Sequence, residues 1–226
     1  MIKYIKYLLI IVVFNYLPIN LSAETLELNF SNGSNGFVGD FADYPVGTED
    51  FYELSWGWEN LLSQTELKKG LYLSGNNHSD DLWMYVKRRI DGLQPNTAYE
   101  LEFTVLIESN VSENMIGIGG SPGEGVTLKA GASTVEPNKV EQDGNYVMNV
   151  DKGNQSVGGS NAVVIGDLAN PLVNSEEPGY QPKYLNSVPL TVQTDQDGCL
   201  WIFIGSDSGF EGTSKFYIAE VILSIE

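Results

Sequence analysis

Beyond residue 23 the sequence shows no stretch of sustained helical periodicity, and this most restricts the folds open to it. Short segments that alternate apolar and polar residues recur instead, separated by turns rich in the chain's 24 glycines. The clearest segment is 99–107, where every second residue is apolar and Glu100, Glu102 and Thr104 lie between them. The pattern predicts an all-β protein, a two-sheet antiparallel β-sandwich of the jelly-roll type.

Twelve segments have the length and composition of strands. They are residues 26–30, 51–58, 70–74, 82–90, 99–107, 115–118, 126–129, 145–150, 162–165, 188–193, 200–205 and 215–225. No repeat or linker divides them, so we expect one domain over residues 24–226. If segments 82–90 and 99–107 pair as a hairpin, the outward bases of the first meet the outward glutamates of the second.

The first 23 residues have the parts of a secretory signal peptide. Lys3 and Lys6 precede a short apolar run over residues 7–14, and Leu21-Ser22-Ala23 ends the segment with small residues. An uncleaved membrane anchor is the alternative, which the polar and proline residues at 15–20 disfavour. The segment predicts a secreted or periplasmic protein with no membrane insertion after cleavage.

The net charge of the chain restricts the kinds of molecule that it can bind. Removal of residues 1–23 leaves 203 of the 226 residues, with 10 basic against 30 acidic side chains and a formal charge of −20. Such a charge opposes binding to nucleic acid and favours binding of cations. Cys199 is the only cysteine, which excludes an internal disulfide, and its apolar neighbours predict a buried, inert thiol.

Few enzyme classes fit this set of residues. His78 is the only histidine, which excludes a multi-histidine zinc site and leaves a serine triad without a convincing base. A hydrolase that uses two carboxylates stays open because 30 acidic residues are available. Glu124, Asp207 and Glu211 would be the first choices, since they lie in glycine-rich loops. Whether the protein is an enzyme is left undecided, with a non-catalytic role favoured.

Aromatic side chains suggest a place for a ligand. Sugar-binding sandwiches stack pyranose rings on exposed aromatic rings and orient them with a few polar groups. Trp56 with Trp58 and Trp83 with Tyr85 alternate along predicted strands, so each pair would form a flat strip if exposed; packing in the core or shielding of a sheet edge is the alternative for both pairs. Loop 75–81, which contains His78, would supply polar groups to the same ligand. Trp201 and Phe203 belong to a continuous apolar strand and are assigned to the core.

Two stretches of the sequence resemble a known family. The order Ile90-Asp-Gly-Leu93-Gln-Pro95 followed by Tyr99-Glu-Leu-Glu-Phe103 resembles the strand, corner and strand of carbohydrate-binding-module-like jelly rolls in the galactose-binding-like superfamily. The alternating segment 216–223 is similar to the last strand of that group. Fibronectin type III domains share the Leu-x-Pro-x-x-x-Tyr corner, so the resemblance is one of architecture.

The resemblance also implies a metal ion. In such jelly rolls a structural calcium commonly bridges an N-terminal loop to an acidic residue on the last strand, which here implies Glu220 with Asp40 or Asp43. Loops 39–44, 195–198 and 206–212 carry the carboxylates that calcium prefers. Ala219 and Glu220 stand where the family often has two aspartates, so the match is incomplete.

Three functions follow from these features. The first is an exported, non-catalytic ligand-binding module, with carbohydrate as the ligand class that the resemblance implies. The second is a secreted hydrolase acting on glycans or esters through paired carboxylates. The third is an acidic periplasmic or surface structural protein. A deep cleft with two convergent carboxylates would favour the second function, and a shallow aromatic groove the first.

Overall fold

The computed structural model describes residues 24–63, 68–174, 176–177 and 179–226. Within them every paired strand is antiparallel and no helix occurs, so the predicted all-β sandwich is confirmed. No helix in these ranges is long and apolar enough to cross a membrane. The expected signal peptide lies outside the described residues, and export stays a prediction.

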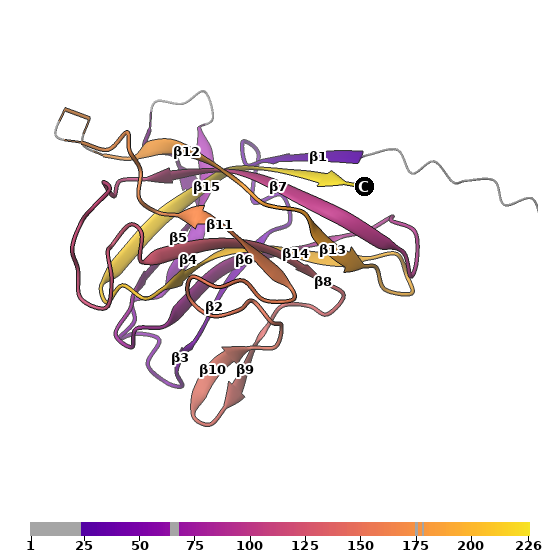
Figure 1. The fold of residues 1–226 in the computed structure, drawn as a ribbon, viewed down its shortest axis with the longest axis horizontal. Helices are drawn as coiled ribbons and strands as arrows, with labels where there is room; N and C mark the ends of the chain where they lie inside the picture. The colour runs from indigo at the N-terminus through magenta and orange to yellow at the C-terminus, as the bar shows by residue number, and fades with distance from the viewer. Residues whose placement is uncertain (1–23, 64–67, 175, 178) are drawn as a thin grey trace, which may run out of the picture.

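Two sheets form the layers of the sandwich (Figure 1). The seven-stranded sheet runs in the order β12-β7-β15-β5-β4, with β1 also paired to β15 and β13 to β7. Its strands are β1 (Glu24–Asn29), β4 (Ser55–Asn60), β5 (Lys69–Asn76), β7 (Ala98–Ser109), β12 (Gln181–Asn186), β13 (Leu190–Gln193) and β15 (Thr213–Ile225).

The five-stranded sheet runs in the order β11-β8-β14-β6-β2. Its strands are β2 (Val38–Ala42), β6 (Leu82–Ile90), β8 (Val126–Ser133), β11 (Ala162–Asp167) and β14 (Leu200–Ser208). A small third sheet, in the order β3-β10-β9, comprises β3 (Tyr44–Pro45), β9 (Lys139–Gln142) and β10 (Asn145–Met148). In Figure 1, β9 and β10 project from the molecule on the side of β2.

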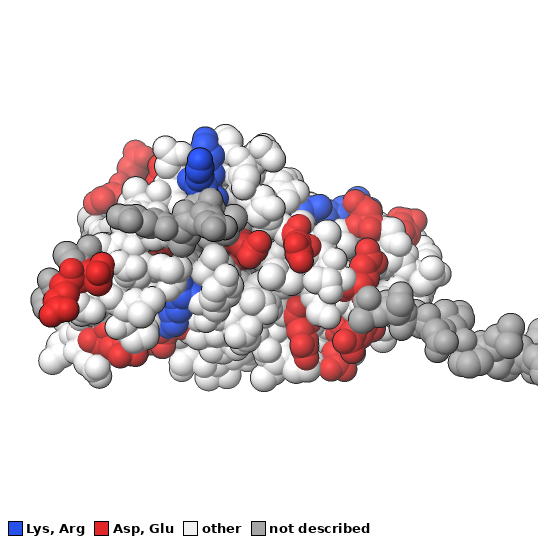
Figure 2. All heavy atoms as spheres, turned by 90° about the horizontal axis from the view of Figure 1, so that it is seen from above, with Lys and Arg blue, Asp and Glu red and all other residues white. Residues whose placement is uncertain are grey.

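The main core lies between the two large sheets. On β7, Leu101, Phe103, Val105 and Ile107 are buried while Glu100 and Glu102 are exposed, as the alternation predicted. Phe216, Ile218 and Val221 of β15 join them from the neighbouring strand. Figure 2 shows acidic side chains spread along one face of the surface, with basic groups at a few places.

Two local predictions are wrong. Strand β6 pairs with β2 and β14, whereas β7 pairs with β12, β13 and β15, so these neighbours lie in opposite sheets and form no hairpin. The corner at residues 91–97 carries the chain across the core instead of folding it back within one sheet. Residues 115–118 form no strand, and Ile116 is almost fully exposed on a surface loop.

A long connection covers part of the five-stranded sheet on the side away from the core. Residues 134–161, here called the covering segment, join β8 to β11 and include β9 and β10. Val150 and Met148 pack on Trp83, Tyr85 and Phe203, which form a second apolar cluster outside the main core. The sandwich therefore has a third layer over part of one face.

Candidate functional site

The outer face of the five-stranded sheet is organised as four rows of residues that lie opposite one another on neighbouring strands. At one end, row one is Arg89–Trp201–Ser133 and row two is Val38–Lys87–Phe203–Gly131. At the other end, row three is Asp40–Tyr85–Gly205–Lys129 and row four is Ala42–Trp83–Asp207–Thr127. Residues in register on antiparallel strands point to the same face, so the rows fix which side chains meet.

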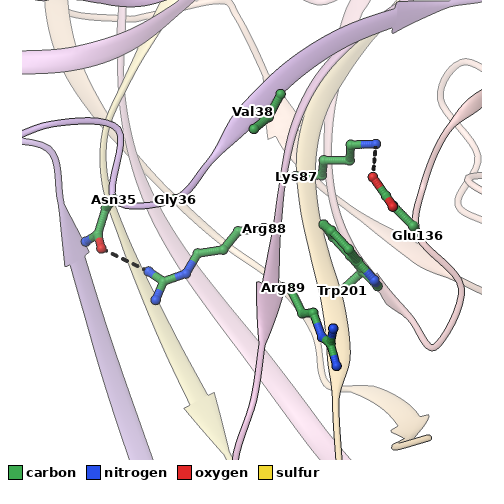
Figure 3. Close-up of a pocket in the computed structure, with 8 residues that line it drawn as sticks. All are labelled: Asn35, Gly36, Val38, Lys87, Arg88, Arg89, Glu136 and Trp201. Atoms are coloured by element: carbon green, nitrogen blue, oxygen red, sulfur yellow. Dashed lines mark hydrogen bonds and ion pairs between the residues drawn. The ribbon is translucent and has the colours of Figure 1, made fainter.

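Rows one and two border an open groove of about 600 Å³ (Figure 3). Its lining residues come from the loop before β2, from β2, β6 and β14, and from the covering segment. They are Asn35, Gly36, Val38, Lys87, Arg88, Arg89, Glu136 and Trp201. Trp201 is half-buried, with its ring between the Lys87–Glu136 pair and Arg89. The groove thus combines one aromatic ring with charged and amide groups.

The polar groups of the groove are held by specific partners. Lys87 Nζ donates to Glu136 Oε1 at 2.7 Å and to the Pro137 carbonyl at 2.8 Å, which fixes the covering segment beside the groove. Arg89 Nε lies 2.9 Å from Asp91 Oδ1 in a solvent-exposed ion pair. Arg88 Nη1 donates to Asn35 Oδ1 at 3.1 Å.

Rows three and four end in a buried ion network. Asp207 Oδ2 accepts from Lys129 Nζ and from Lys152 Nζ, both at 2.7 Å, and Lys152 Nζ also lies 2.8 Å from Asp43 Oδ2. Asp207 and Lys129 are fully buried. Lys129 Nζ also donates to the carbonyls of Lys152 and Val157, so the network ties the sheet to the covering segment.

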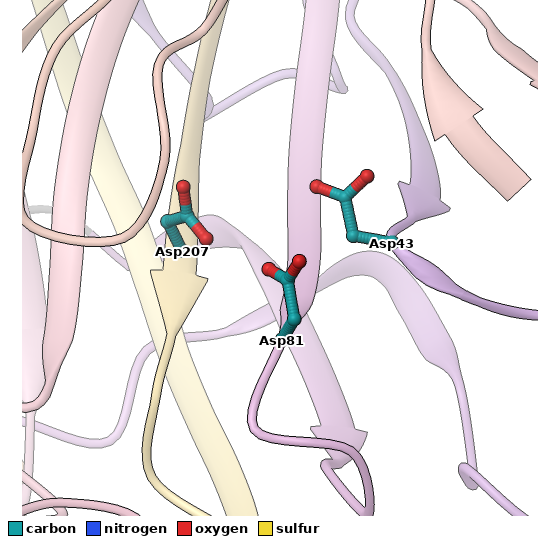
Figure 4. A group of neighbouring side chains, drawn as sticks. All are labelled: Asp43, Asp81 and Asp207. Carbon is teal, nitrogen blue, oxygen red and sulfur yellow. The ribbon is translucent and has the colours of Figure 1, made fainter.

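Three carboxyl groups meet in this network (Figure 4). One oxygen each from Asp43, Asp81 and Asp207 lies within 4.8 Å of the others. Burial, reinforced by the charge of Asp43, raises the pKa of Asp81 to about 7. Burial also raises the pKa of Asp43, against the opposing effect of Lys152. With Lys129 and Lys152 beside them, one proton held by Asp81 brings the network to neutrality.

Two of the expected ligand-binding residues are inaccessible. Trp83 and Tyr85 point away from the main core, as alternation predicted, but both are 0% exposed. The covering segment packs over their rings, and the Tyr85 hydroxyl donates to the Pro137 carbonyl at 3.3 Å. The expectation that they form an exposed strip is wrong, because alternation gives the face of a side chain and not what covers that face.

The other expected aromatic pair lies on the opposite sheet. Trp56 of β4 is half-buried and packs against the main core. Trp58 is 39% exposed, with its indole nitrogen donating to the Phe30 carbonyl at 2.7 Å and Lys69 Nζ 3.7 Å from its ring centroid. The lysine already occupies a face of that ring. A ligand role for this pair stays a prediction.

His78 is exposed and stacks on the ring of Phe51 with 3.9 Å between ring centroids. Its Nε2 lies 3.1 Å from the Phe51 carbonyl oxygen. The loop that carries it is not among the residues that line the groove. A role for His78 in ligand binding therefore stays a prediction, separate from the groove.

The expected metal ligands are not brought together. Glu220 lies on β15 in the seven-stranded sheet, opposite Asn29 and Leu106, while Asp40 lies on β2 and Asp43 follows it. Asp40 pairs with Lys139 at 3.3 Å, and Lys152 lies against Asp43. Calcium binding itself stays a prediction, which a comparison of melting temperatures in excess calcium and in chelator will test.

The groove contains a residue that sequence reasoning assigned wrongly. The apolar run 199–204 predicts a core position for Trp201, but the residue lies on the outer face in row one and is not part of the apolar cluster that the covering segment packs on. Phe203, two residues on, is buried as expected, beneath the covering segment. Pairing of Trp201 with the charged Arg89 across strands was the signal that could have indicated an outer position.

No family model matches the sequence, and no curated protein matches it. Among solved structures, a family 11 carbohydrate-binding module from Clostridium thermocellum, in complex with a mixed-linked tetrasaccharide, is 10% identical, with a TM-score of 0.40 over 88% of this chain and 94% of that one. The xylan-binding module CBM15 is 12% identical, with a TM-score of 0.40 over 90% of this chain and 97% of that one.

A third solved structure is the enzymatically active domain of bacteriophage CBA120 tailspike protein 4, at 11% identity and a TM-score of 0.38. It covers 84% of this chain, which spans only 19% of the tailspike chain. Carbohydrate-binding modules are thus among the solved structures to which this chain is similar. The likeness is one of architecture, and the side chains of the groove are described by this chain alone.

Proposed function

We propose that this protein is an exported, non-catalytic carbohydrate-binding module whose ligand lies in the groove at Trp201. The observation that carries the proposal is the half-buried indole of Trp201 in an open groove of about 600 Å³, flanked by Asn35, Glu136 and two arginines. An aromatic face packs against the C–H face of a pyranose, and the flanking groups are suited to its hydroxyls.

The carboxylates support binding over hydrolysis. Glu136 is the one carboxylate among the residues that line the groove, and Lys87 holds it at 2.7 Å. Hydrolysis of a glycosidic bond commonly needs two carboxyl groups that flank the bond. The cluster of Asp43, Asp81 and Asp207 does bring carboxyl groups together, and Asp43 and Asp81 line a separate open pocket of about 410 Å³. Asp207 is fully buried, and Asp43 lies 2.8 Å from Lys152 Nζ, so these carboxyl groups are held in the ion network of the fold.

Affinity electrophoresis in gels containing single polysaccharides tests the proposal. The unaltered protein is expected to be retarded by at least one polysaccharide of a broad set, and Trp201→Ala is expected to lose that retardation. Trp58→Ala is the matched control, because it removes another partly exposed indole from the opposite sheet. Equal melting temperatures of the two variants would show that loss of retardation is not loss of folding.

Two results would overturn the proposal. The first is an unaltered protein that migrates freely in every gel. The second is retention by Trp201→Ala with loss in Trp58→Ala, which would move the ligand to the opposite sheet and favour the site expected from the sequence at Trp56 and Trp58.

A further inference from the structure

Both arginines of the chain line the groove. Arg88 and Arg89 are the only arginines in a sequence of formal charge −18, and they stand next to each other on β6. Lys87 precedes them and also lines the groove. Arginine presents a planar fork of donors that matches carboxylate and sulfate groups, whereas lysine presents a point charge. Their position gives an otherwise acidic protein a local cationic surface beside Trp201.

Arg88 lacks the counter-ion that most other cations of the protein have. Lysines 87, 129, 139, 152, 183 and 215 each form an ion pair, and Arg89 pairs with Asp91. Among the described residues no carboxylate lies within ion-pair distance of Arg88, whose recorded side-chain partner is the neutral amide of Asn35. Arg88 is half-buried, and burial lowers its pKa. A partly desolvated cation without a counter-ion favours binding of an anion.

Arg88 lines the groove from the side of β6 opposite to Trp201, next to the point where the pairing of β2 with β6 ends (Figure 3). Gly36, beside Arg88, has a φ of +79°, and a Cβ there would lie 3.8 Å from Arg88 Nε. That distance is an ordinary van der Waals contact, so the positive φ favours glycine at this position and the space beside Arg88 does not require it. Glu136, which could repel an anion, is neutralised by Lys87 on the far side of the Trp201 ring (Figure 3).

We infer that the groove selects acidic saccharides, with a carboxylate or sulfate group of the ligand paired to Arg88 while a sugar ring packs on Trp201. The inference rests on the proposed function, because it assigns the ligand class of the same groove. Arg89 contributes second, since its ion pair with Asp91 is exposed and exchanges readily with an incoming anion.

Titration calorimetry with paired oligosaccharides tests the charge preference at constant sugar backbone. One pair is a galacturonic acid hexamer and its methyl ester, and the other is a sulfated galactan oligosaccharide and its desulfated form. At least one acidic member is expected to bind tenfold or more tightly than its neutral partner, with the preference falling as sodium chloride is raised. The pair that shows the preference identifies the anion as carboxylate or sulfate.

Arg88→Gln is expected to remove the preference, so that the acidic and the neutral member bind with similar affinity. Lys215→Gln is the matched control, because it removes one positive charge from the seven-stranded sheet and is expected to keep the preference. Melting temperatures of both variants establish that each remains folded at the temperature of the titration.

The outcomes separate this inference from the proposed function. If the acidic and neutral members bind equally and Trp201→Ala abolishes the binding of both, the acidic preference would be overturned. The proposal that the groove binds carbohydrate would still hold. If an acidic oligosaccharide still binds Trp201→Ala but no longer binds Arg88→Gln, the result would support recognition of the anion and contradict stacking of the sugar on Trp201. No measurable binding of any of the four oligosaccharides would overturn the acidic preference, and free migration in every polysaccharide gel would then overturn the proposed function as well.

Discussion

The outer face of the five-stranded sheet has the same strand pairing at both ends, but the two ends differ in exposure and in the charges beside their tryptophans. At the open end, Trp201 stands in a groove beside Arg88 and Arg89. At the closed end, Trp83 lies on the same face of the same sheet but is 0% exposed, next to the buried pair of Lys129 and Asp207. The covering segment makes the difference, because its apolar residues reach rows two to four and stop short of Trp201.

This contrast shows that the role of an outward side chain depends on distant parts of the chain. Strand alternation places Trp83 and Trp201 on the outer face alike. Residues 134–161 then convert one end into a second core and leave the other in contact with solvent. The two tryptophans therefore give a direct comparison of packing and exposure within a single sheet.

The largest expected effect is on stability at the closed end. Trp83→Ala removes a fully buried ring that contacts Tyr85 and Phe203, and we expect it to cost about 3–5 kcal/mol of unfolding free energy. Trp201→Ala is expected to cost less than about 1.5 kcal/mol, since its half-buried ring leaves no closed cavity. Urea unfolding of both variants at 25 °C measures the difference. Similar losses in the two would contradict the assignment of one end as core and the other as groove.

Removal of the central carboxylate of the ion network is expected to have the next largest effect. Asp207→Ala leaves the buried ammonium of Lys129 without a counter-ion, at an expected cost of about 3 kcal/mol. The value lies at the lower end for a broken buried pair, because Asp43 still pairs with Lys152. Glu59→Ala is the control, since it breaks the partly exposed pair with Lys215 and should cost less than about 1 kcal/mol. A loss for Asp207→Ala no larger than for the control would show that the network contributes little to stability.

The sequence predicted the fold class and the faces of its clearest strand, but not the site. Alternation at residues 99–107 correctly gave the buried and exposed faces of β7, because local side-chain chemistry decides which face meets the core. The burial of Trp83 could not be predicted, because it depends on contacts with Val150 and Met148 in a connection more than 60 residues away. The same limit applies to Asp43, Asp81 and Asp207, which three separate loops and strands bring together.

A further expected effect concerns the pH dependence of stability at the closed end. Native Asp81 has a pKa of about 7 against 3.8 for an ordinary aspartate, so between these values the folded protein holds a proton that the unfolded chain releases. The contribution of Asp81 to the unfolding free energy is therefore fully present below about pH 4 and is lost as the pH rises through 7. The unfolding free energy should fall over this range with a slope below about 1.4 kcal/mol per pH unit, the limit for one proton.

Asp81→Asn is expected to flatten this slope, because the amide that replaces the carboxyl group does not titrate. Asp151→Asn is the control: hydrogen bonds from Ser160 and Gly153 lower the pKa of Asp151, so its contribution is lost only as pH falls below about 4. Urea unfolding at pH 4, 5, 6, 7 and 8 gives the slopes. A slope for Asp81→Asn as steep as that of the unaltered protein would mean that the closed end holds no proton, and that its three carboxylates are compensated in another way.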